Sequence, residues 1–417
     1  MYRKLITALT CLILGQTHAN TPAPFVHSMD LPFNQYSWVA AHNAFNRNLT
    51  PVPNQSLTMA AQLQAGVRGL MLDLVQSGNE VRLCHSVCLG GEERLENALK
   101  DTIMPFLASN SDAVVTLLVE GEVPRAMLHT SFNRVPGLAN ATFKPGSWNT
   151  SQWPTLRQMK ESGQRLLIFH LNSSMAGDYE LNSGTAHVMA STQGTVENYW
   201  SLGDTIFSHD YSCKSRWDNI PLASRSVTFP GKSWDRLFVM NQFHGVSLSA
   251  HSRQDNRFDK LLDRHNNHCF PAAQRIANYI AIDHIEQGDG LPFAGVLSQG
   301  GVIFYEGNRA MQNIVCGIPG RVTININTQN DSLGCENDEA RSARIVGLPA
   351  GTRISIYDSP SGSTSDDYTI ITLRRNIEDL VIPTFQQNVN NADIEMVFRR
   401  HNGLDGKVSR IKIEPPG

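Results

Sequence analysis

The sequence has no long run of charge of one sign, and only 18% of its residues are charged. Lysine and arginine number 35 against 38 aspartate and glutamate residues, which gives a formal net charge of −3. A basic field that would attract nucleic acid or an acidic membrane surface is therefore absent. Beyond the first residues, no apolar stretch reaches the roughly 18 residues that a membrane-spanning helix needs. Apolar residues at 41% are nevertheless ordinary for a globular protein, which excludes a disordered, coiled-coil or collagen-like chain.

The first residues have the pattern of a secretory leader. A basic start, Met1–Lys4, precedes the short apolar stretch Leu5–Gly15, and Thr17-His-Ala19 is a small-x-small cleavage site. This pattern predicts a signal peptide, residues 1–19, and export of the mature chain to the outside of the cell or to a periplasm.

No Cys-x-x-Cys pair occurs, which disfavours a structural zinc site. Seven cysteines are present, and all except Cys11 lie beyond the predicted leader. The remaining even number in an exported chain indicates disulfides. The sequence leaves many pairings open, with free buried thiols as the alternative. We predict that neighbours along the chain pair, as Cys84–Cys88, Cys213–Cys269 and Cys316–Cys335.

Short aliphatic runs alternate with helix-like stretches through most of the chain. Continuous apolar runs separated by amphipathic stretches are typical of buried parallel strands and their crossover helices. The expected strands are Val67–Val75, Ala113–Val119, Arg165–Leu171, Asp204–Phe207, Arg236–Gln242 and Tyr279–Ile285, with helices such as Glu93–Ala108 and Gln274–Asn278. We therefore predict an α/β fold with a (β/α) TIM-type barrel over residues 20–309.

Polar residues stand at or near the ends of these apolar runs. They are His42, Asp73, Glu120, His170, Asn241 and Asp283. In a barrel, the carboxyl ends of the strands carry the chemistry. Any one of the 14 histidines is more often structural than catalytic, so the combination matters more than a single residue.

The last part of the chain has a different sequence pattern. Helical patterns nearly vanish after Asn313, and short alternating runs are separated by turn clusters. These runs are Arg321–Ile326, Ala343–Val346, Thr352–Tyr357, Tyr368–Leu373, Asp393–Phe398 and Lys407–Ile413. They predict a small all-β sandwich over residues 310–417.

Several segments place a histidine or an acid in or just after an apolar run. They are Trp38-Val-Ala-Ala-His-Asn43, Gly66-Val-Arg-Gly-Leu-Met-Leu-Asp73, Cys84-His-Ser86 and Thr116-Leu-Leu-Val-Glu120. In order and spacing they resemble the X domain of phosphatidylinositol-specific phospholipase C, and most closely its extracellular branch. The resemblance covers about residues 30–300.

This resemblance implies a phosphodiesterase that uses two histidines as acid and base. His42 would take the proton from the inositol 2-hydroxyl, and His85 would protonate the departing glycerol oxygen. Asp283 would hold His42 in the right tautomer, and Arg68 is a further catalytic candidate. The implied partner is a phosphoinositide or a related phosphodiester lipid at a membrane surface.

The resemblance also implies a divalent cation. Asn43, Asp73 and Glu120 are three candidate oxygen ligands for Ca²⁺, with water or substrate phosphate completing the shell. Met71 stands where the calcium-dependent branch usually has an acid, and Asp73 where the metal-independent branch usually has arginine. The alternative is that Asp73 and Glu120 pair with Arg68 or orient the histidines.

The C-terminal region loosely resembles the βγ-crystallin fold. That family's calcium motif fits Asn337-Asp-x-x-Arg-Ser342 except at Arg341, and the segment that starts at Asp405 fits less well. These departures favour a plain sandwich that docks on a substrate or a cell surface.

Two other functions stay open. A glycerophosphodiester phosphodiesterase is disfavoured by Met71 and by Ser86 after His85, because that class needs an acid at each position. A non-catalytic surface-binding protein on the same scaffold is disfavoured by the presence of both His42 and His85.

Overall fold

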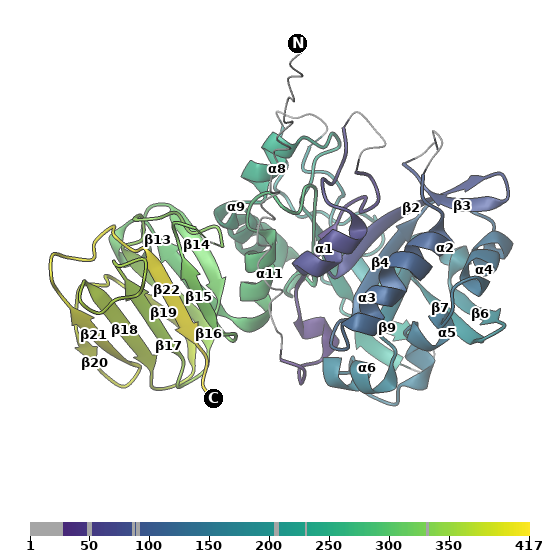
Figure 1. Ribbon diagram of the computed structural model, residues 1–417. Coiled ribbons are helices and arrows are strands. Elements are labelled where there is room, and N and C mark those ends of the chain that lie inside the picture. The colour runs from purple at the N-terminus through teal and green to yellow at the C-terminus, as the bar shows by residue number, and fades with distance from the viewer. Residues whose placement is uncertain are drawn as a thin grey trace, which may run out of the picture.

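The computed structural model describes residues 28–47, 52–85, 88, 92–203, 208–229, 232–330 and 333–417. The predicted signal peptide and the predicted strand Asp204–Phe207 lie outside these residues. Two bodies of different architecture lie side by side, an α/β body and an all-β body (Figure 1). Within the described part of the chain, no helix combines the length and the apolarity needed to cross a bilayer.

Parallel strands form the centre of the α/β body. In spatial order they are β7 (Gly184–Ala190), β5 (Leu166–His170), β4 (Val115–Glu120), β2 (Gly69–Ser77), β1 (Trp38–Ala41), β12 (Tyr279–Ile282), β11 (Leu237–Asn241) and β8 (Thr195–Glu197). Most of their side chains are buried on both faces, as their continuous apolar runs predict. The predicted α/β barrel is confirmed. Among the described residues, no hydrogen-bonded pairing joins β7 to β8, so the ladder is open there.

Helices and short hairpins surround these strands. The helices are α1 (Met59–Ala65), α2 (Leu95–Asn97), α3 (Met104–Ser109), α4 (Arg125–Asn133), α5 (Leu138–Ala141), α6 (Leu156–Ser162), α7 (Ser191–Gly194), α8 (Ser249–Asp255), α9 (Phe258–Arg264), α10 (Phe270–Ala273) and α11 (Gly290–Gln299). The antiparallel additions are β3 (Glu80–Leu83), β6 (Gly177–Leu181), β9 (Ser226–Phe229) and β10 (Lys232–Asp235).

One predicted helix is wrong. Gln274–Asn278 is not helical, because α10 ends at Ala273 and Gln274 takes the left-handed conformation with φ 55°. The segment instead leads directly into β12. The Asn278 side chain accepts a hydrogen bond from the Phe238 amide and donates to the Tyr36 carbonyl, so it joins the barrel strands.

The all-β body consists of two antiparallel sheets. One contains β14 (Ile314–Pro319), β13 (Gly301–Tyr305), β16 (Ser342–Leu348) and β19 (Ile377–Ile382). The other contains β15 (Ile324–Asn327), β22 (Arg410–Glu414), β17 (Arg353–Tyr357), β18 (Tyr368–Leu373), β21 (Ile394–Arg399) and β20 (Val389–Asn390). Apolar residues of both sheets share one core, as in a sandwich.

The sandwich begins earlier than the sequence predicts. Strand β13 pairs with β14 and β16, so the antiparallel sheets begin at Gly301, ahead of the predicted boundary at 310. Helices α9 and α11 lie between the sandwich and the barrel strands (Figure 1). A Cβ at Gly317 of β14 would fall 2.0 Å from the ring of Phe258 in α9, so the close contact between the two bodies needs glycine there.

The guanidinium of Arg341 lies between the two segments that resemble calcium motifs. Nη1 of Arg341 donates to the carbonyls of Glu306 and Glu339, each at 2.9 Å. Its Nε lies 3.8 Å from Oδ1 of Asp405. The residue that breaks the predicted motif therefore places a positive charge of the chain itself among these oxygens.

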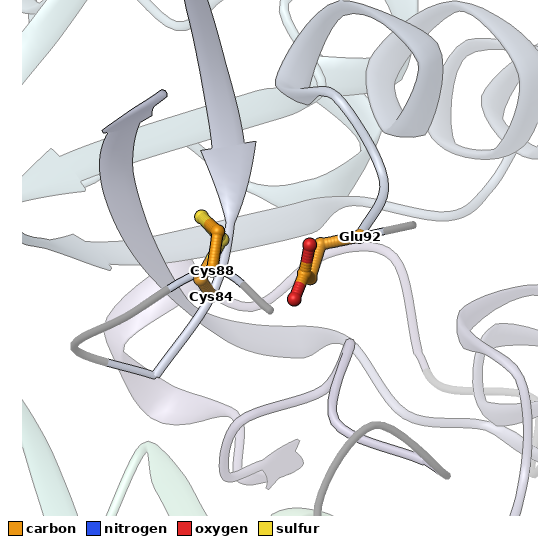
Figure 2. A group of neighbouring side chains, drawn as sticks. All are labelled: Cys84, Cys88 and Glu92. Atoms are coloured by element: carbon orange, nitrogen blue, oxygen red, sulfur yellow. A yellow bond between two sulfur atoms is a disulfide. The ribbon is translucent and has the colours of Figure 1, made fainter. Parts of the chain in front are cut away.

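The three predicted disulfides are present: Cys84–Cys88, Cys213–Cys269 and Cys316–Cys335. Figure 2 shows the buried Glu92 beside the first of them. Cys84, Cys88 and Glu92 lie close enough together to bind a metal ion. Both cysteines are joined in the disulfide, however, so neither can act as a thiolate ligand.

Candidate active site

A cavity of about 590 Å³ lies at the carboxyl ends of the barrel strands. This volume is ordinary for a small-molecule site. The predicted residues His42, Asn43, Asp73, His85 and Glu120 all line the cavity. The barrel therefore brings together residues that lie far apart in the sequence.

His42 is held by an aspartate from the neighbouring strand. Strands β1 and β12 pair with Ala41 opposite Ile282, so the next residues, His42 and Asp283, leave the two strands together. Nδ1 of His42 lies 2.8 Å from Oδ1 of Asp283, a carboxylate that is only 2% exposed. When Nδ1 donates this hydrogen bond, Nε2 is left as the nitrogen that can take a proton.

The turn that carries His42 is fixed by backbone contacts. Asn43 takes the left-handed conformation with φ 44°, which asparagine tolerates better than most residues. The amide of Ala44 then donates to the Met71 carbonyl at 3.0 Å, and the amide of Asn46 donates to the Asn43 carbonyl at 2.8 Å. The turn is thus anchored to β2, next to Asp73.

Two residues that the sequence analysis missed also position this pair. The Asn54 amide donates to Oδ1 of Asp283 at 2.9 Å, and its own oxygen accepts from Asn46 at 2.7 Å. The ring of Phe243 stacks flat on His42, with ring centroids 3.6 Å apart and an angle of 8° between the planes. Neither residue belongs to a recognisable motif, so only the fold identifies them.

His85 reaches the cavity on a hairpin above the barrel. Strand β2 continues past Asp73 and turns back into β3, whose end leads into Cys84. The amide of Cys84 donates to the Asp73 carbonyl at 3.1 Å, which places the next residue, His85, at the cavity. The Cys84–Cys88 disulfide closes the loop around this exposed histidine.

Two carboxyl groups lie in contact beside the histidines. Asp73 and Glu120 are register partners on the parallel strands β2 and β4, and their side chains hydrogen-bond. Burial raises the pKa of Asp73 to about 7, and the negative charge of Glu120 adds to this rise. Asp73 therefore keeps its proton until the pH approaches neutrality.

Arg216, which the sequence analysis missed, lies beside these carboxyl groups in the lining of the cavity. Arg216 donates to Glu120 and to Glu197, each at 2.9 Å, and all three side chains line the cavity. Burial acts to lower the pKa of the Arg216 guanidinium, but Glu197 and Glu120 together raise it above its ordinary value. Arg216 lies in the loop between β8 and β9, where no sequence pattern marks it.

Arg68, the further catalytic candidate, does not belong to the described residues that line the cavity. Its Nη1 donates to the carbonyls of Leu63 and Val67, each at 2.8 Å, and its guanidinium lies over the Phe106 ring. Arg68 directly precedes β2, so it stands at the amino end of the strand, whereas the cavity lies at the carboxyl ends. Burial lowers its pKa to about 10.

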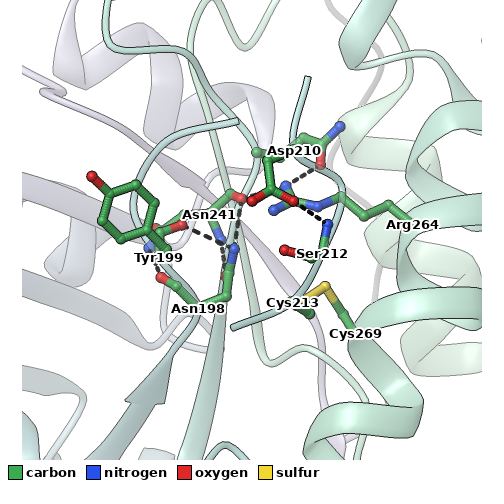
Figure 3. The surroundings of a disulfide bond; sticks show 9 residues. Asn198, Tyr199, Asp210, Ser212, Cys213, Asn241, Arg264 and Cys269 are labelled. Atoms are coloured by element: carbon green, nitrogen blue, oxygen red, sulfur yellow. Dashed lines mark hydrogen bonds between the residues drawn. A yellow bond between two sulfur atoms is a disulfide. The ribbon is translucent and has the colours of Figure 1, made fainter. Parts of the chain in front are cut away.

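Two other polar residues at strand ends, His170 and Asn241, make structural contacts. The described residues that line the cavity do not include them. Burial lowers the pKa of His170 to about 4, so the ring is neutral, and its Nδ1 accepts from the Asn172 amide at 3.1 Å. Asn241 donates to the Asn198 carbonyl at 2.9 Å (Figure 3).

Comparison with known proteins gives a consistent set of relatives. Residues 30–200 match the family model described as PI-PLC X 1. A PI-PLC X domain-containing protein of Arabidopsis thaliana is 29% identical over 363 residues, which cover 83% of this chain and 75% of the plant protein. An uncharacterized secreted protein of Arthroderma benhamiae is 31% identical over 157 residues, 36% of this chain and 34% of the fungal protein. Among solved structures, the phosphatidylinositol-specific phospholipase C from Listeria monocytogenes aligns with a TM-score of 0.43 and 13% identity, over 62% of this chain and 91% of that protein.

Proposed function

We propose that this chain, whose residues 30–200 match the PI-PLC X 1 family model, is an exported phosphodiesterase that cleaves phosphatidylinositol-type lipids. One observation carries the proposal: His42, oriented by Asp283, and His85 line the same cavity. Cleavage of a phosphodiester needs a base for the nucleophile and an acid for the leaving group, and neutral imidazole and imidazolium suit these tasks near neutral pH.

In the proposed reaction, each histidine carries out one proton transfer. Nε2 of His42 takes the proton of the inositol 2-hydroxyl, and the oxygen attacks the phosphorus. The bond from phosphorus to the glycerol oxygen breaks, and His85 gives its proton to that oxygen. Diacylglycerol leaves, and a cyclic inositol phosphate remains. Water can open the ring with the two histidines in reversed roles.

Arg216 supplies positive charge at the same cavity. Its guanidinium is fixed between Glu120 and Glu197, so it needs little reorganisation when negative charge builds up on the phosphoryl oxygens. Part of this charge is already neutralised by the two carboxylates. A second cation would therefore add to the stabilisation.

The Ca²⁺ ligands expected from the sequence fit such a cation in part. Asp73 and Glu120 are in contact, and Asp73 carries a proton that a divalent cation would replace. Asn43 lines the same cavity. We include Ca²⁺ in the proposal, held by these three residues together with water or substrate phosphate. When bound, it would stabilise negative charge on the phosphate.

The edge of the cavity supports a lipid substrate. Val52, Trp200 and Val246 are exposed apolar side chains, and all three belong to the cavity lining. Exposed apolar groups gathered at a site entrance favour contact with an apolar phase.

A product assay over a panel of headgroups tests the proposal. Vesicles that carry phosphatidylinositol, a glycan-anchored inositol lipid, phosphatidylcholine or a glycerophosphodiester are incubated with the wild type and with His85→Ala. We expect diacylglycerol and cyclic inositol phosphate from inositol lipids with the wild type only. Release from glycerophosphodiesters alone would indicate the other phosphodiesterase class, and binding without turnover would indicate a surface-binding protein.

The pKa of Asp73 predicts how Ca²⁺ binding depends on pH. The folded protein keeps the proton on Asp73 up to about pH 7, so Ca²⁺ must displace it at lower pH. We expect the affinity to fall about tenfold per pH unit below about pH 7 and to level off above it. Calorimetric Ca²⁺ titrations at about pH 6 and about pH 8 measure this change.

The control for this titration is Asp73→Asn, which removes the titrating proton and the negative charge of one ligand. Its affinity should be low and independent of pH. Full activity of the wild type in excess chelator would contradict the cation and assign the electrostatic role to Arg216 alone.

A further inference from the structure

A second cluster of metal-binding side chains lies next to the cavity. It consists of His209, His244 and Asp255, and their ligand atoms all lie within 4.8 Å of one another. Nε2 of His209 lies 3.1 Å from Oδ1 of Asp255, and Nε2 of His244 lies 3.1 Å from Oδ2 of the same carboxylate. His244 and Asp255 are buried, and His209 is partly exposed. The proposed catalytic reaction uses none of the three.

The donor set selects one class of metal ion. Two imidazole nitrogens and a carboxylate are typical ligands of Zn²⁺ and related transition metals, whereas Ca²⁺ and Mg²⁺ prefer oxygen. Tetrahedral Zn²⁺ with ligands at about 2.0 Å separates neighbouring ligand atoms by about 3.3 Å. The two observed nitrogen–oxygen distances are close to this value, although they involve different oxygens of Asp255. The three ligand atoms lie within 4.8 Å of one another, so they would move inward to share one ion.

The three ligands come from separate parts of the chain that are already fixed. Asp255 ends α8, and its backbone carbonyl accepts from the Gln242 side chain at 3.0 Å. Arg264, which is 1% exposed, holds Gln242 by donating to its side-chain oxygen at 2.6 Å. Such outer contacts orient metal ligands in known sites.

His209 belongs to a segment with its own covalent anchor. The Cys213–Cys269 disulfide ties this segment to the helical region after α9, and the Ser212 amide donates to Asp210 at 2.9 Å (Figure 3). The segment that carries His209 therefore stays close to His244 with or without an ion.

A fourth position is also available near the cluster. His251 lies on α8 four residues before Asp255, which places both on the same face of the helix. Its ring centroid is 5.8 Å from that of His244. His251 is not among the three clustered ligands, so a water molecule would complete the tetrahedron.

We propose that His209, His244 and Asp255 form a Zn²⁺-type site that holds the segment 208–213 against the wall of the cavity. The site is joined to the catalytic pair through two chain neighbours. Phe243, next to His244, stacks on His42. Asn256, next to Asp255, donates to the Asp283 carbonyl at 2.9 Å. The ion is thus a positioning group for the cavity and takes no part in proton transfer.

Calorimetry with Zn²⁺ alone on the full chain, stripped with chelator, tests the site. We expect one ion per chain and a higher melting temperature with Zn²⁺, because a ligand that binds the folded state stabilises it. His209→Gln should weaken binding by about a hundredfold and abolish the thermal shift, since it removes a direct ligand. Its partly exposed position keeps the risk of misfolding low.

Two control variants isolate the site. His187→Gln breaks an unrelated histidine–aspartate pair, in which Nδ1 of His187 lies 2.6 Å from Asp178, and it should bind Zn²⁺ like the wild type. His42→Gln should also bind normally, which separates this site from the catalytic pair. Absence of Zn²⁺ binding to the wild type, or normal binding by His209→Gln, would overturn the proposal.

A spectroscopic measurement on the wild type needs no variant. Co²⁺ in place of Zn²⁺ should give the intense visible absorption of a tetrahedral site with nitrogen and oxygen ligands. A weak octahedral spectrum, or none, counts against the proposal even if a variant fails to fold. Activity is not used as a readout, so the outcome does not depend on the proposed lipid cleavage.

Discussion

Replacement of His42 by alanine is expected to lower the rate of inositol-lipid cleavage by about a hundredfold or more, because the attacking hydroxyl loses its base. The fold should persist. The His42 ring lies at the cavity, and its removal leaves Asp283 with the hydrogen bond from Asn54. Initial rates on phosphatidylinositol vesicles give the activity, and thermal unfolding shows whether the variant is folded.

Two further variants make this result specific. Asp283→Asn keeps the shape but favours the wrong tautomer of His42, so it should lose much of the activity and change the pH dependence of the rate. His129→Ala removes a half-buried histidine that lies outside the described cavity lining and whose Nε2 contacts the Glu180 carbonyl at 2.7 Å, and its rate should match the wild type. A loss of less than about tenfold in His42→Ala would remove this residue from the catalytic pair.

Sequence patterns located the barrel because its strands are short, apolar and buried on both faces. Strands β2, β4 and β11 lie within the predicted runs to within a few residues. The same signal did not place β13, Gly301–Tyr305, in the sandwich, because a continuous apolar run has the same appearance in either sheet. Only the pairing partner decides, and pairing is a long-range property.

The sequence analysis could propose site residues where histidines and acids stand at or near the ends of predicted strands. His42, Asp283 and Glu120 stand at the carboxyl ends of their strands. Asp73 lies within β2 as the register partner of Glu120, so strand pairing brings it to the same place. Arg68 stands apart from them because it precedes β2, at the amino end of the strand.

Arg216, Asn54 and Phe243 escaped prediction for a different reason. They come from loops, and their roles depend on contacts with residues far away in the sequence. No periodicity or turn signal encodes such contacts.

The last prediction concerns the small covalent ring that the Cys84–Cys88 disulfide closes around His85. The double variant Cys84→Ser, Cys88→Ser should remain folded yet lose about a hundredfold in turnover. The ring has a sequence separation of only 4, so opening it returns little loop entropy to the unfolded chain. Its effect is local, because it fixes the backbone that carries His85, and a displacement of about 1 Å at a reacting group can cost about a hundredfold in rate.

The sandwich disulfide supplies the matched control for this variant. Cys316–Cys335 has a sequence separation of 19 and lies in the all-β body. Its double serine variant should therefore lower the melting temperature more and the turnover less, since a longer loop gains more entropy and no catalytic residue lies within it. Rates and unfolding curves for both variants distinguish the two effects. Normal turnover after loss of Cys84–Cys88 would mean that β3 and the Cys84 amide contact to Asp73 suffice to position His85.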